Sequence, residues 1–152
     1  MRVSAKTDYA IRAALELAAA EDERPVKGER IATAQAIPLR FLENILMQLR
    51  HAGLVESRRG ADGGYRLARP ASEVKLADVI RAIDGPLAGV QGVRPEGLGF
   101  TGVAAPMKDV WIAVRASLRS VLEQVTLADV VSGELPSHVR ELLGDEDAWV
   151  SH

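Results

Sequence analysis

The chain has 152 residues, enough for one domain or for a small domain with an appendage. Hydrophobic residues make up 47% of it but aromatic residues only 4%, a balance that favours a mainly helical core. No uncharged apolar run approaches the roughly 18–20 residues that a membrane-spanning helix needs. Charged residues interrupt the apolar N-terminal segment, which argues against a signal peptide. We therefore expect a soluble, cytoplasmic protein that has no membrane partner.

The absence of cysteine narrows the chemistry further. It excludes disulfides, thiol nucleophiles, thiolate zinc sites and cysteine-ligated iron–sulfur clusters. The histidines, His51, His138 and His152, lie far apart and lack the spacing of metal ligands. The chain contains neither a phosphate-binding glycine loop nor a nucleophile elbow. The sequence therefore predicts no catalytic residue, no metal and no cofactor, and an enzyme is not expected.

Charge is distributed unevenly along the chain. Residues 1–70 carry 12 Lys and Arg against 9 Asp and Glu, whereas residues 71–152 carry 7 against 12. The net charge of −2 thus combines a basic first part with an acidic second part. A basic N-terminal part suits a domain that contacts phosphate groups.

Two helices are predicted at the start of the chain. The first covers residues 4–20, and Ser4 is a suitable N-cap. Its apolar face follows the helical spacing i, i+3, i+4, i+7 and comprises Ile11, Ala14, Leu15 and Ala18. A short helix follows over residues 28–35.

A third, longer helix runs from Pro38 to about Ala52. Proline suits the first helical position, because its missing N–H is not needed there, and Gly53 suits the residue after the helix end. The buried row is expected to comprise Leu39, Leu42, Leu46 and Leu49, with Ile45 at its margin. A short helix, a brief turn and a longer helix are the elements of a helix-turn-helix.

A glycine-rich hairpin follows the third helix. Residues 54–58 and 65–68 are predicted as short strands, joined by residues 59–64. A hairpin in this place is a wing. Ser72 is expected to begin the next helix, whose apolar face ends where Gly85 and Pro86 stop it.

Residues 85–105 contain six glycines and two prolines, which favour a mobile loop or linker. Beyond it, apolar residues recur at alternating spacings of four and three, the pattern of a helix that packs along its length against a partner helix. These residues are Met107, Trp111, Val114, Leu118, Val121 and Val125. Thr126 and Asp129 resemble a capping box that opens a short helix ending near Gly133, and another short helix is possible in the tail.

The expected fold class is mainly α with a small β-hairpin wing. Residues 1–84 would form a winged helix-turn-helix domain that binds DNA, residues 85–105 a flexible loop, and residues 106–133 the helices of a homodimer. Residues 134–152 would form a C-terminal tail.

The outward positions of the third helix can read base edges. The first turns of a recognition helix enter the major groove, and here they carry Arg40, Glu43 and Asn44. Arginine can donate two hydrogen bonds to guanine, asparagine can make the paired contact with adenine, and glutamate can accept from cytosine. The alternative is a solvated helix face, which the position between a turn and a wing makes the weaker interpretation.

The wing carries arginines beside glycines that permit close backbone approach: Arg58, Arg59, Gly63, Gly64 and Arg66. Arginine suits a narrow minor groove, where the electrostatic potential is most negative. The alternative is an ordinary hairpin with surface arginines.

Trp111 has two interpretations. It is either an apolar residue of the dimer interface or, beside the glycine-rich loop, a surface on which an effector stacks. Phe100 would add apolar surface to such a site, and Arg94 would add a charge for an anionic ligand.

These segments together resemble the Rrf-two (IscR/NsrR-like) family of bacterial winged-helix repressors. The resemblance rests on MRVSAKTDYAIRAALELA, IPLRFLENILMQLRHAGLVESRRGADGGYRLARP, VKLADVIRAIDGP and TLADVV. It implies a homodimer that crosses long C-terminal helices and reads a palindromic operator. The family's DNA-contacting positions correspond to Arg40, Glu43 and Arg59, and its usual aromatic residue corresponds to Phe41.

One departure from the family is informative. Its sensor members carry three cysteines between the winged domain and the long helix, where residues 85–106 of this chain have none. Sensing through a cluster is therefore not implied, and a metabolite or a partner protein remains possible as the signal. The alternative to a DNA-binding repressor is a winged-helix interaction module that docks a partner protein, against which the arginines of the recognition helix and wing argue.

Overall fold

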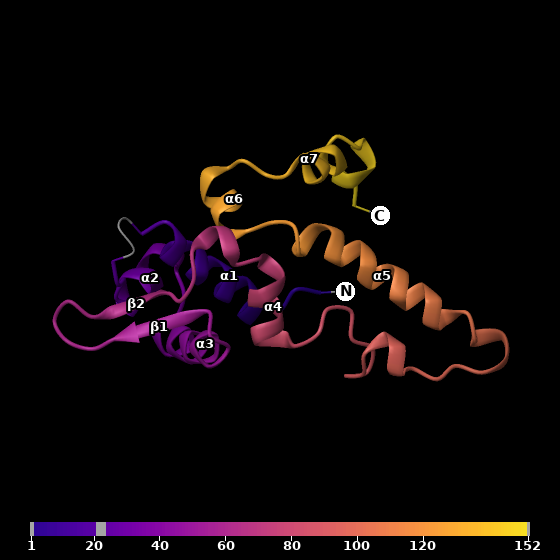
Figure 1. Ribbon diagram of the computed structural model, residues 1–152, viewed down its shortest axis with the longest axis horizontal. Helices are drawn as coiled ribbons and strands as arrows, with labels where there is room; N and C mark the ends of the chain where they lie inside the picture. Colours follow the sequence, from indigo (N-terminus) through magenta and orange to yellow (C-terminus); the bar gives the residue numbers. More distant parts are fainter. Residues whose placement is uncertain (1, 21–23, 152) are drawn as a thin grey trace.

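The computed structural model describes residues 2–20 and 24–151. Its helices and strands are α1 (Ala5–Ala18), α2 (Gly28–Gln35), α3 (Leu39–His51), β1 (Val55–Arg58), β2 (Gly64–Leu67), α4 (Leu76–Asp84), α5 (Met107–Leu122), α6 (Leu127–Ser132) and α7 (Ser137–Leu143). The first six elements and α6 form a body from which α5 projects as an arm (Figure 1). The predicted mainly helical fold with a winged helix-turn-helix is confirmed. Among the described residues, every helix is too short or too polar to cross a membrane.

Helix α1 is the centre of the body. Its cap is the predicted one, since the Ser4 side chain accepts a hydrogen bond from the N–H of Thr7 at 3.1 Å. The helix contacts α2, α3, α4, α6 and β2. Its buried row is Ala10, Ala13, Ala14 and Leu17, so the predicted row was wrong by one position. Ile11, Leu15 and Ala18 are half-buried against the same core.

Helix α3 buries a row that differs from the prediction at its start. Leu42, Ile45, Leu46 and Leu49 are all fully buried. Leu39 is 38% exposed, because it is the first residue of the helix, and Pro38 is its N-cap with an extended backbone instead of its first residue. The turn before it passes through Ala36 in the left-handed conformation. Gly53 follows the helix end with φ +73°, as predicted.

The wing is a two-stranded antiparallel sheet in which Val55 pairs with Leu67 and Arg58 with Gly64. The base of the wing also pairs with the segment before α2, because Val26 and Tyr65 exchange both backbone hydrogen bonds, at 2.7 and 2.8 Å. Gly64 permits this pairing. A Cβ on Gly64 would lie 2.6 Å from the carbonyl oxygen of Val26, and its φ of +149° is one that glycine adopts readily.

Helix α4 begins at Leu76, four residues later than the prediction. Residues Ala71–Glu73 form a 3-10 turn instead, and Val74 is extended and fully buried. The extended conformation lets the carbonyl of Val74 accept a hydrogen bond from the N–H of Leu127 at 2.9 Å. The hydrogen bond to the start of α6 therefore replaces helix formation at Ser72. It joins segments that are distant in the sequence, so local patterns could not predict it.

The glycine-rich segment has more local structure than its composition predicts. It contains 3-10 turns at Pro95–Gly97 and Gly102–Ala104, and Val90 and Val93 exchange two backbone hydrogen bonds. Leu87 is 7% exposed and anchors the segment to the body. These contacts give the segment a defined path between α4 and α5.

The arm helix α5 ends at Leu122, and none of its residues is buried. Val125, the last residue of the predicted apolar row, lies beyond this end and is 3% exposed. Its side chain is buried in its own chain, and its backbone is held to the body, since the N–H of Leu76 donates a hydrogen bond to the Val125 carbonyl at 3.0 Å. We therefore define the α5 row as Met107, Trp111, Val114, Leu118 and Val121.

The chain returns to the body after α5. Thr126 and Asp129 form the predicted capping box, with hydrogen bonds of 2.7 and 3.1 Å, and Gly133 ends α6. Leu127 is fully buried in the core around α1, so α6 packs on the winged body. The predicted tail helix is α7, which lies beside the end of α5 because His138 Nε2 contacts the carbonyl oxygen of Ser120 at 2.7 Å.

We predict that Gly64→Ala destabilises the protein by about 2–4 kcal/mol, because the added Cβ collides with backbone instead of a movable side chain. Urea unfolding followed by circular dichroism measures the loss. The control is Gly99→Ala, where the added methyl group meets nothing within 4 Å, and its effect should stay within about 0.5 kcal/mol. Equal stabilities for the two variants would contradict the role given to Gly64.

Candidate nucleic-acid interface

The exposed face of α3 carries the predicted base-reading residues. Arg40, Glu43 and Asn44 are all exposed. Arg40 and Glu43 make no hydrogen bond or ion pair with any residue that the structure describes, and Asn44 accepts one from Gln48 Nε2 at 3.3 Å. The first two turns of α3 therefore present a cation and a carboxylate that are available to a ligand.

Packing against α1 and α2 fixes the direction of α3. Phe41 meets the Tyr9 ring edge to face, with ring centroids 5.7 Å apart. The guanidinium of Arg12 lies over the Tyr9 ring, 4.7 Å from its centre. Arg12 also donates to the carbonyl of Gln35 at 2.9 Å, at the end of α2. The aromatic residue at position 41 thus links α3 to the centre of the body.

The three wing arginines do not have equal surroundings. Arg58 and Arg59 are exposed and have no hydrogen-bonding or ion-pairing partner in the described part of the chain. Arg66 instead donates from Nε and Nη2 to Glu56 Oε2, at 3.1 and 2.9 Å, across the two strands. The charge of Arg66 is therefore already compensated, which leaves Arg58 and Arg59 as the cations available at the wing.

The two wing glycines have roles inside the protein. A Cβ on Gly63 would lie 2.2 Å from the carbonyl oxygen of Arg58, so this glycine permits the tight turn that carries Arg58 and Arg59. Gly64 permits the pairing with Val26 described above. Both glycines therefore shape the wing, a role distinct from the close approach to DNA for which the sequence suggested them.

Two contacts that position the interface have no sequence signal. Arg50, near the end of α3, donates to Ser57 Oγ on β1 at 3.0 Å and so ties the wing to the recognition helix. The pairing of Val26 with Tyr65 holds the base of the wing from the other side. Neither pair follows a helical or strand period, so only the folded structure could identify them.

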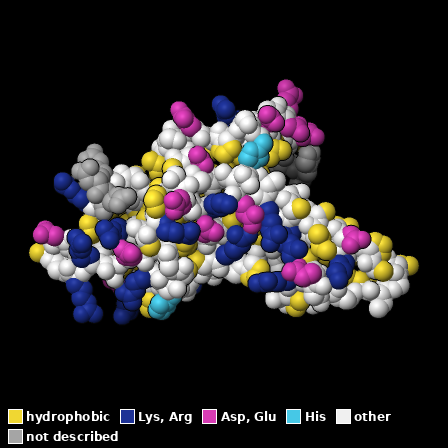
Figure 2. Space-filling model, viewed as in Figure 1, with side chains coloured by type: hydrophobic (Ala, Val, Ile, Leu, Met, Phe, Trp, Pro, Cys, Tyr) yellow, Lys and Arg dark blue, Asp and Glu magenta, His cyan; other side chains and the backbone are white. Residues whose placement is uncertain are grey.

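Figure 2 shows where charged side chains gather on one face of the molecule. Basic side chains project where α3 and the wing lie, and acidic side chains gather over α7 and the C-terminal 3-10 turn at Glu146–Trp149. A second group of basic side chains lies over the junction of the body with α5. On this face, acidic side chains of the second part of the sequence are thus concentrated at its C-terminal end, whereas arginines of the same part lie at the junction with α5.

One of the residues considered for an effector site lines a cavity. Arg94 lines a cavity of about 350 Å³ between α4 and α5, whereas Phe100 and Trp111 are not among the residues that line it. Its walls carry four arginines, so the cavity differs in chemistry from the aromatic surface expected there.

Comparison with known proteins identifies the family. Residues 3–133 match the model of the Rrf2 family, described as iron-dependent transcriptional regulators. The chain belongs to the Rrf2 family. It is therefore a helix-turn-helix transcriptional regulator and not an enzyme, and such a regulator acts on DNA.

Individual Rrf2 relatives match over most of their length. Rv1287 of Mycobacterium tuberculosis, named as an HTH-type transcriptional regulator, is 52% identical over 99% of this chain and 94% of its own. The structure of CymR, the global cysteine regulator of Bacillus subtilis, is 32% identical and has a TM-score of 0.73 over 87% of this chain and 97% of that one. The T. potens IscR structure is 34% identical, with a TM-score of 0.69 over 100% and 93%.

The family is described as iron-dependent, so we compared the possible metal ligands of this chain with those that an iron site needs. The sequence has no cysteine, so no thiolate is available to a cluster. Within residues 2–20 and 24–151, no three His, Asp or Glu side chains gather in a group that could hold a metal ion. The residues present therefore do not fit a cysteine-ligated iron–sulfur cluster.

We predict that Arg59→Gln weakens operator binding about tenfold, because it removes a charge-assisted contact of about 1.5 kcal/mol. Fluorescence anisotropy on an operator located by genomic footprinting measures the affinity. The matched control replaces Glu56 and Arg66 together by glutamine, which removes their ion pair without changing the net charge, and should change affinity less than about twofold, since exposed pairs contribute little. If the control lost as much affinity as Arg59→Gln, Arg66 would be a DNA contact despite its pairing.

Proposed function

We propose that this Rrf2 protein is a cytoplasmic repressor that binds a palindromic operator as a homodimer, without an iron–sulfur cluster. The observation that carries the proposal is the placement of unpaired cations. Arg40 on α3 and Arg58 and Arg59 on the wing are exposed and lack partners among the described residues, and α3 packs against the wing strand β1. Exposed cations that lie close together repel one another, and binding to the phosphate groups of DNA compensates this repulsion.

The proposed reading of DNA uses two grooves. Helix α3 enters the major groove, where Arg40 donates to guanine, Asn44 pairs with adenine and Glu43 accepts from cytosine. The wing follows the neighbouring minor groove, where Arg58 and Arg59 meet the more negative potential of narrow A·T tracts. The link from Arg50 to Ser57 keeps the two elements at a fixed angle, so both can engage at once.

The arm supports the homodimer. Met107 is 36% exposed, the α5 row has no buried member, and Val110 beside it is 47% exposed. An apolar stripe on a projecting helix is unfavourable in water unless a second surface covers it. A largely apolar cavity of about 330 Å³, whose lining includes Leu118, Ile80 and Val3, continues the stripe toward the body. A second α5 with the same spacing of apolar residues is the complementary partner, because a two-fold interface pairs a surface with itself.

Repression follows from occupancy. Two winged domains joined by their arms engage two half-sites together, and the first contact raises the effective concentration of the second domain. A dimer held in this way over a promoter blocks access to the DNA beneath it. The two domains need half-sites related by the two-fold axis of the dimer, which is why a palindrome is expected.

Replacement of Arg40 tests the reading of DNA. Arg40→Ala should lose roughly 1–3 kcal/mol of operator binding and relax the preference at one base pair in each half-site. Competition binding with operators mutated one position at a time measures both effects. Arg140→Ala, an exposed arginine on α7, is the control and should bind as the wild type does. Wild-type affinity and wild-type base preference for Arg40→Ala would instead favour a module that docks a partner protein.

A charge placed on the arm tests the homodimer. Val114→Asp should raise the dimer dissociation constant by at least about 100-fold, because an unpaired charge buried in an interface costs roughly 3–5 kcal/mol. Leu142→Asp, at a 53% exposed position on α7, is the control and should remain dimeric. Sedimentation velocity at micromolar concentration measures the association. A wild-type protein that sediments as a monomer under these conditions would contradict the homodimer.

A further inference from the structure

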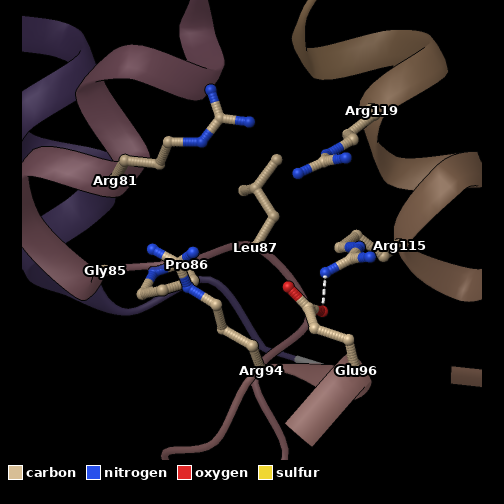
Figure 3. Close-up of a pocket in the computed structure, with 8 residues that line it drawn as sticks. All are labelled: Arg81, Gly85, Pro86, Leu87, Arg94, Glu96, Arg115 and Arg119. Carbon is tan, nitrogen blue, oxygen red and sulfur yellow. Dashed lines mark hydrogen bonds and ion pairs between the residues drawn. The ribbon is translucent and has the colours of Figure 1, made fainter. Parts of the chain in front are cut away.

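A cavity of about 350 Å³ lies where the winged body meets the arm. Arg81 belongs to α4, and Arg115 and Arg119 belong to α5. The segment between the helices closes the cavity with Gly85, Pro86, Leu87, Arg94 and Glu96. Figure 3 shows the side chains of Arg81 and Arg119 on opposite sides of Leu87, with Arg94 and Arg115 below them. Four guanidinium groups from three segments thus surround one small space.

The acidic groups nearby do not balance these four cations. Arg115 forms an ion pair with Glu96, and Arg81 forms one with Glu123 and a longer one, at 3.9 Å, with Asp78, a carboxylate that also pairs with Arg69. Arg119 shares the same Glu123, its Nε lying 3.4 Å from Oε1. Arg94 makes no hydrogen bond or ion pair with any residue in the described ranges. Glu96 is the only carboxylate among the lining residues, so the cavity carries an excess of positive charge.

Both carboxylates are held in their charged form. A hydrogen bond with its own backbone, then the hydrogen bond from Arg115, lower the pKa of Glu96, and the charge of Arg94 adds to this effect. The hydrogen bond from Arg81 is the main cause that lowers the pKa of Glu123. The field in the cavity therefore favours negative charge, which is what an anionic ligand would bring.

We propose that this cavity binds a small anion with at least two negative charges, carried by phosphate or carboxylate groups, and that the anion sets the angle between the winged body and the arm. A guanidinium group binds either kind of oxygen pair through two parallel hydrogen bonds. The volume falls within the range of small-molecule pockets. Arg94 is the natural first contact, because it has no competing ion pair, and Leu87 supplies an apolar floor.

Binding of an anion would connect the winged body to the arm. DNA recognition by a dimer requires these two parts to keep a defined geometry. An anion held by Arg81 on α4 and by Arg115 on α5 would bridge the body and the arm directly. Because the arm connects two winged domains in the proposed homodimer, a change of this angle alters their separation on DNA. This regulatory step rests on the proposed function, whereas anion binding itself does not. An effect on operator affinity requires that the anion bind more tightly to one of the two geometries.

The binding test uses isothermal titration calorimetry of the full chain with pyrophosphate and with citrate, against sodium chloride at matched ionic strength. We expect pyrophosphate or citrate to bind with a defined stoichiometry of one per chain, and the two arms distinguish phosphate from carboxylate chemistry. Arg94→Gln should weaken that binding at least about tenfold, the loss of one charged hydrogen-bonding group. Arg140→Gln is the control and should bind as the wild type does. Thermal unfolding without ligand verifies that Arg94→Gln is folded.

Two results would overturn the site. One is a heat of binding no greater than that of matched chloride. The other is an equal loss of anion affinity in Arg94→Gln and Arg140→Gln, which indicates diffuse attraction to surface charge.

Operator titrations with and without the bound anion test regulation. A change in operator affinity of at least threefold in the wild type that is absent in Arg94→Gln supports it. Unchanged operator affinity overturns the regulatory step. A protein that binds the anion but no operator overturns the proposed function and leaves the site standing. Weaker operator binding by Arg94→Gln without any anion would make DNA the occupant and overturn the proposal.

Discussion

The close packing of α1 positions the helices of the winged body and the base of the wing. Its buried face consists mainly of alanines, Ala10, Ala13 and Ala14, which let neighbouring elements approach the helix backbone closely. Helices α2, α3, α4 and α6 and strand β2 all contact it. A larger side chain on this face would force these elements apart, because protein interiors tolerate little added volume. The direction of the recognition helix and the base of the wing both depend on this one helix.

The same helix also controls how the arm leaves the body. Thr7, which is 1% exposed, donates from Oγ1 to Asp84 at 2.5 Å, and Ser4 donates to the same carboxylate at 3.3 Å. Asp84 is the last residue of α4, and the segment toward α5 starts directly after it. The start of α1 thus holds the point from which the arm departs. Helix α1 therefore fixes the position of both the recognition helix and the start of the arm. A regulator whose two winged domains must lie a set distance apart needs such a common support.

Local patterns predicted most of this architecture. The caps at Ser4, Gly53 and Thr126, the wing and the long apolar helix all follow from short-range rules and agree with the structure. Two errors arose where distant segments meet. Helix α4 starts late because Val74 bonds to Leu127, and Val125 leaves the α5 row because it is buried beside Leu76. The predicted buried face of α1 differs from the observed one by one residue. Alanines occur all around this helix, so the spacing of its apolar residues does not indicate which side is buried.

The candidate site was predictable in its residues but not in their pairing. Arg40, Arg58, Arg59 and Arg66 all stand out in the sequence, yet only the cross-strand contact with Glu56 distinguishes Arg66 from the others. The links from Arg50 to Ser57 and from Val26 to Tyr65 depend on tertiary geometry and have no period. The four arginines of the cavity come from three segments, so no window of sequence contains them together.

In the proposed function, two chains joined by their arms read one palindromic operator. Sedimentation velocity of the protein with a labelled duplex that carries either both half-sites or only one tests it most directly. We expect two chains on the complete operator and a loss of affinity of at least about 100-fold on the single half-site, because linkage raises the effective concentration of the second contact. One chain per duplex, bound equally well to the single half-site, would contradict it.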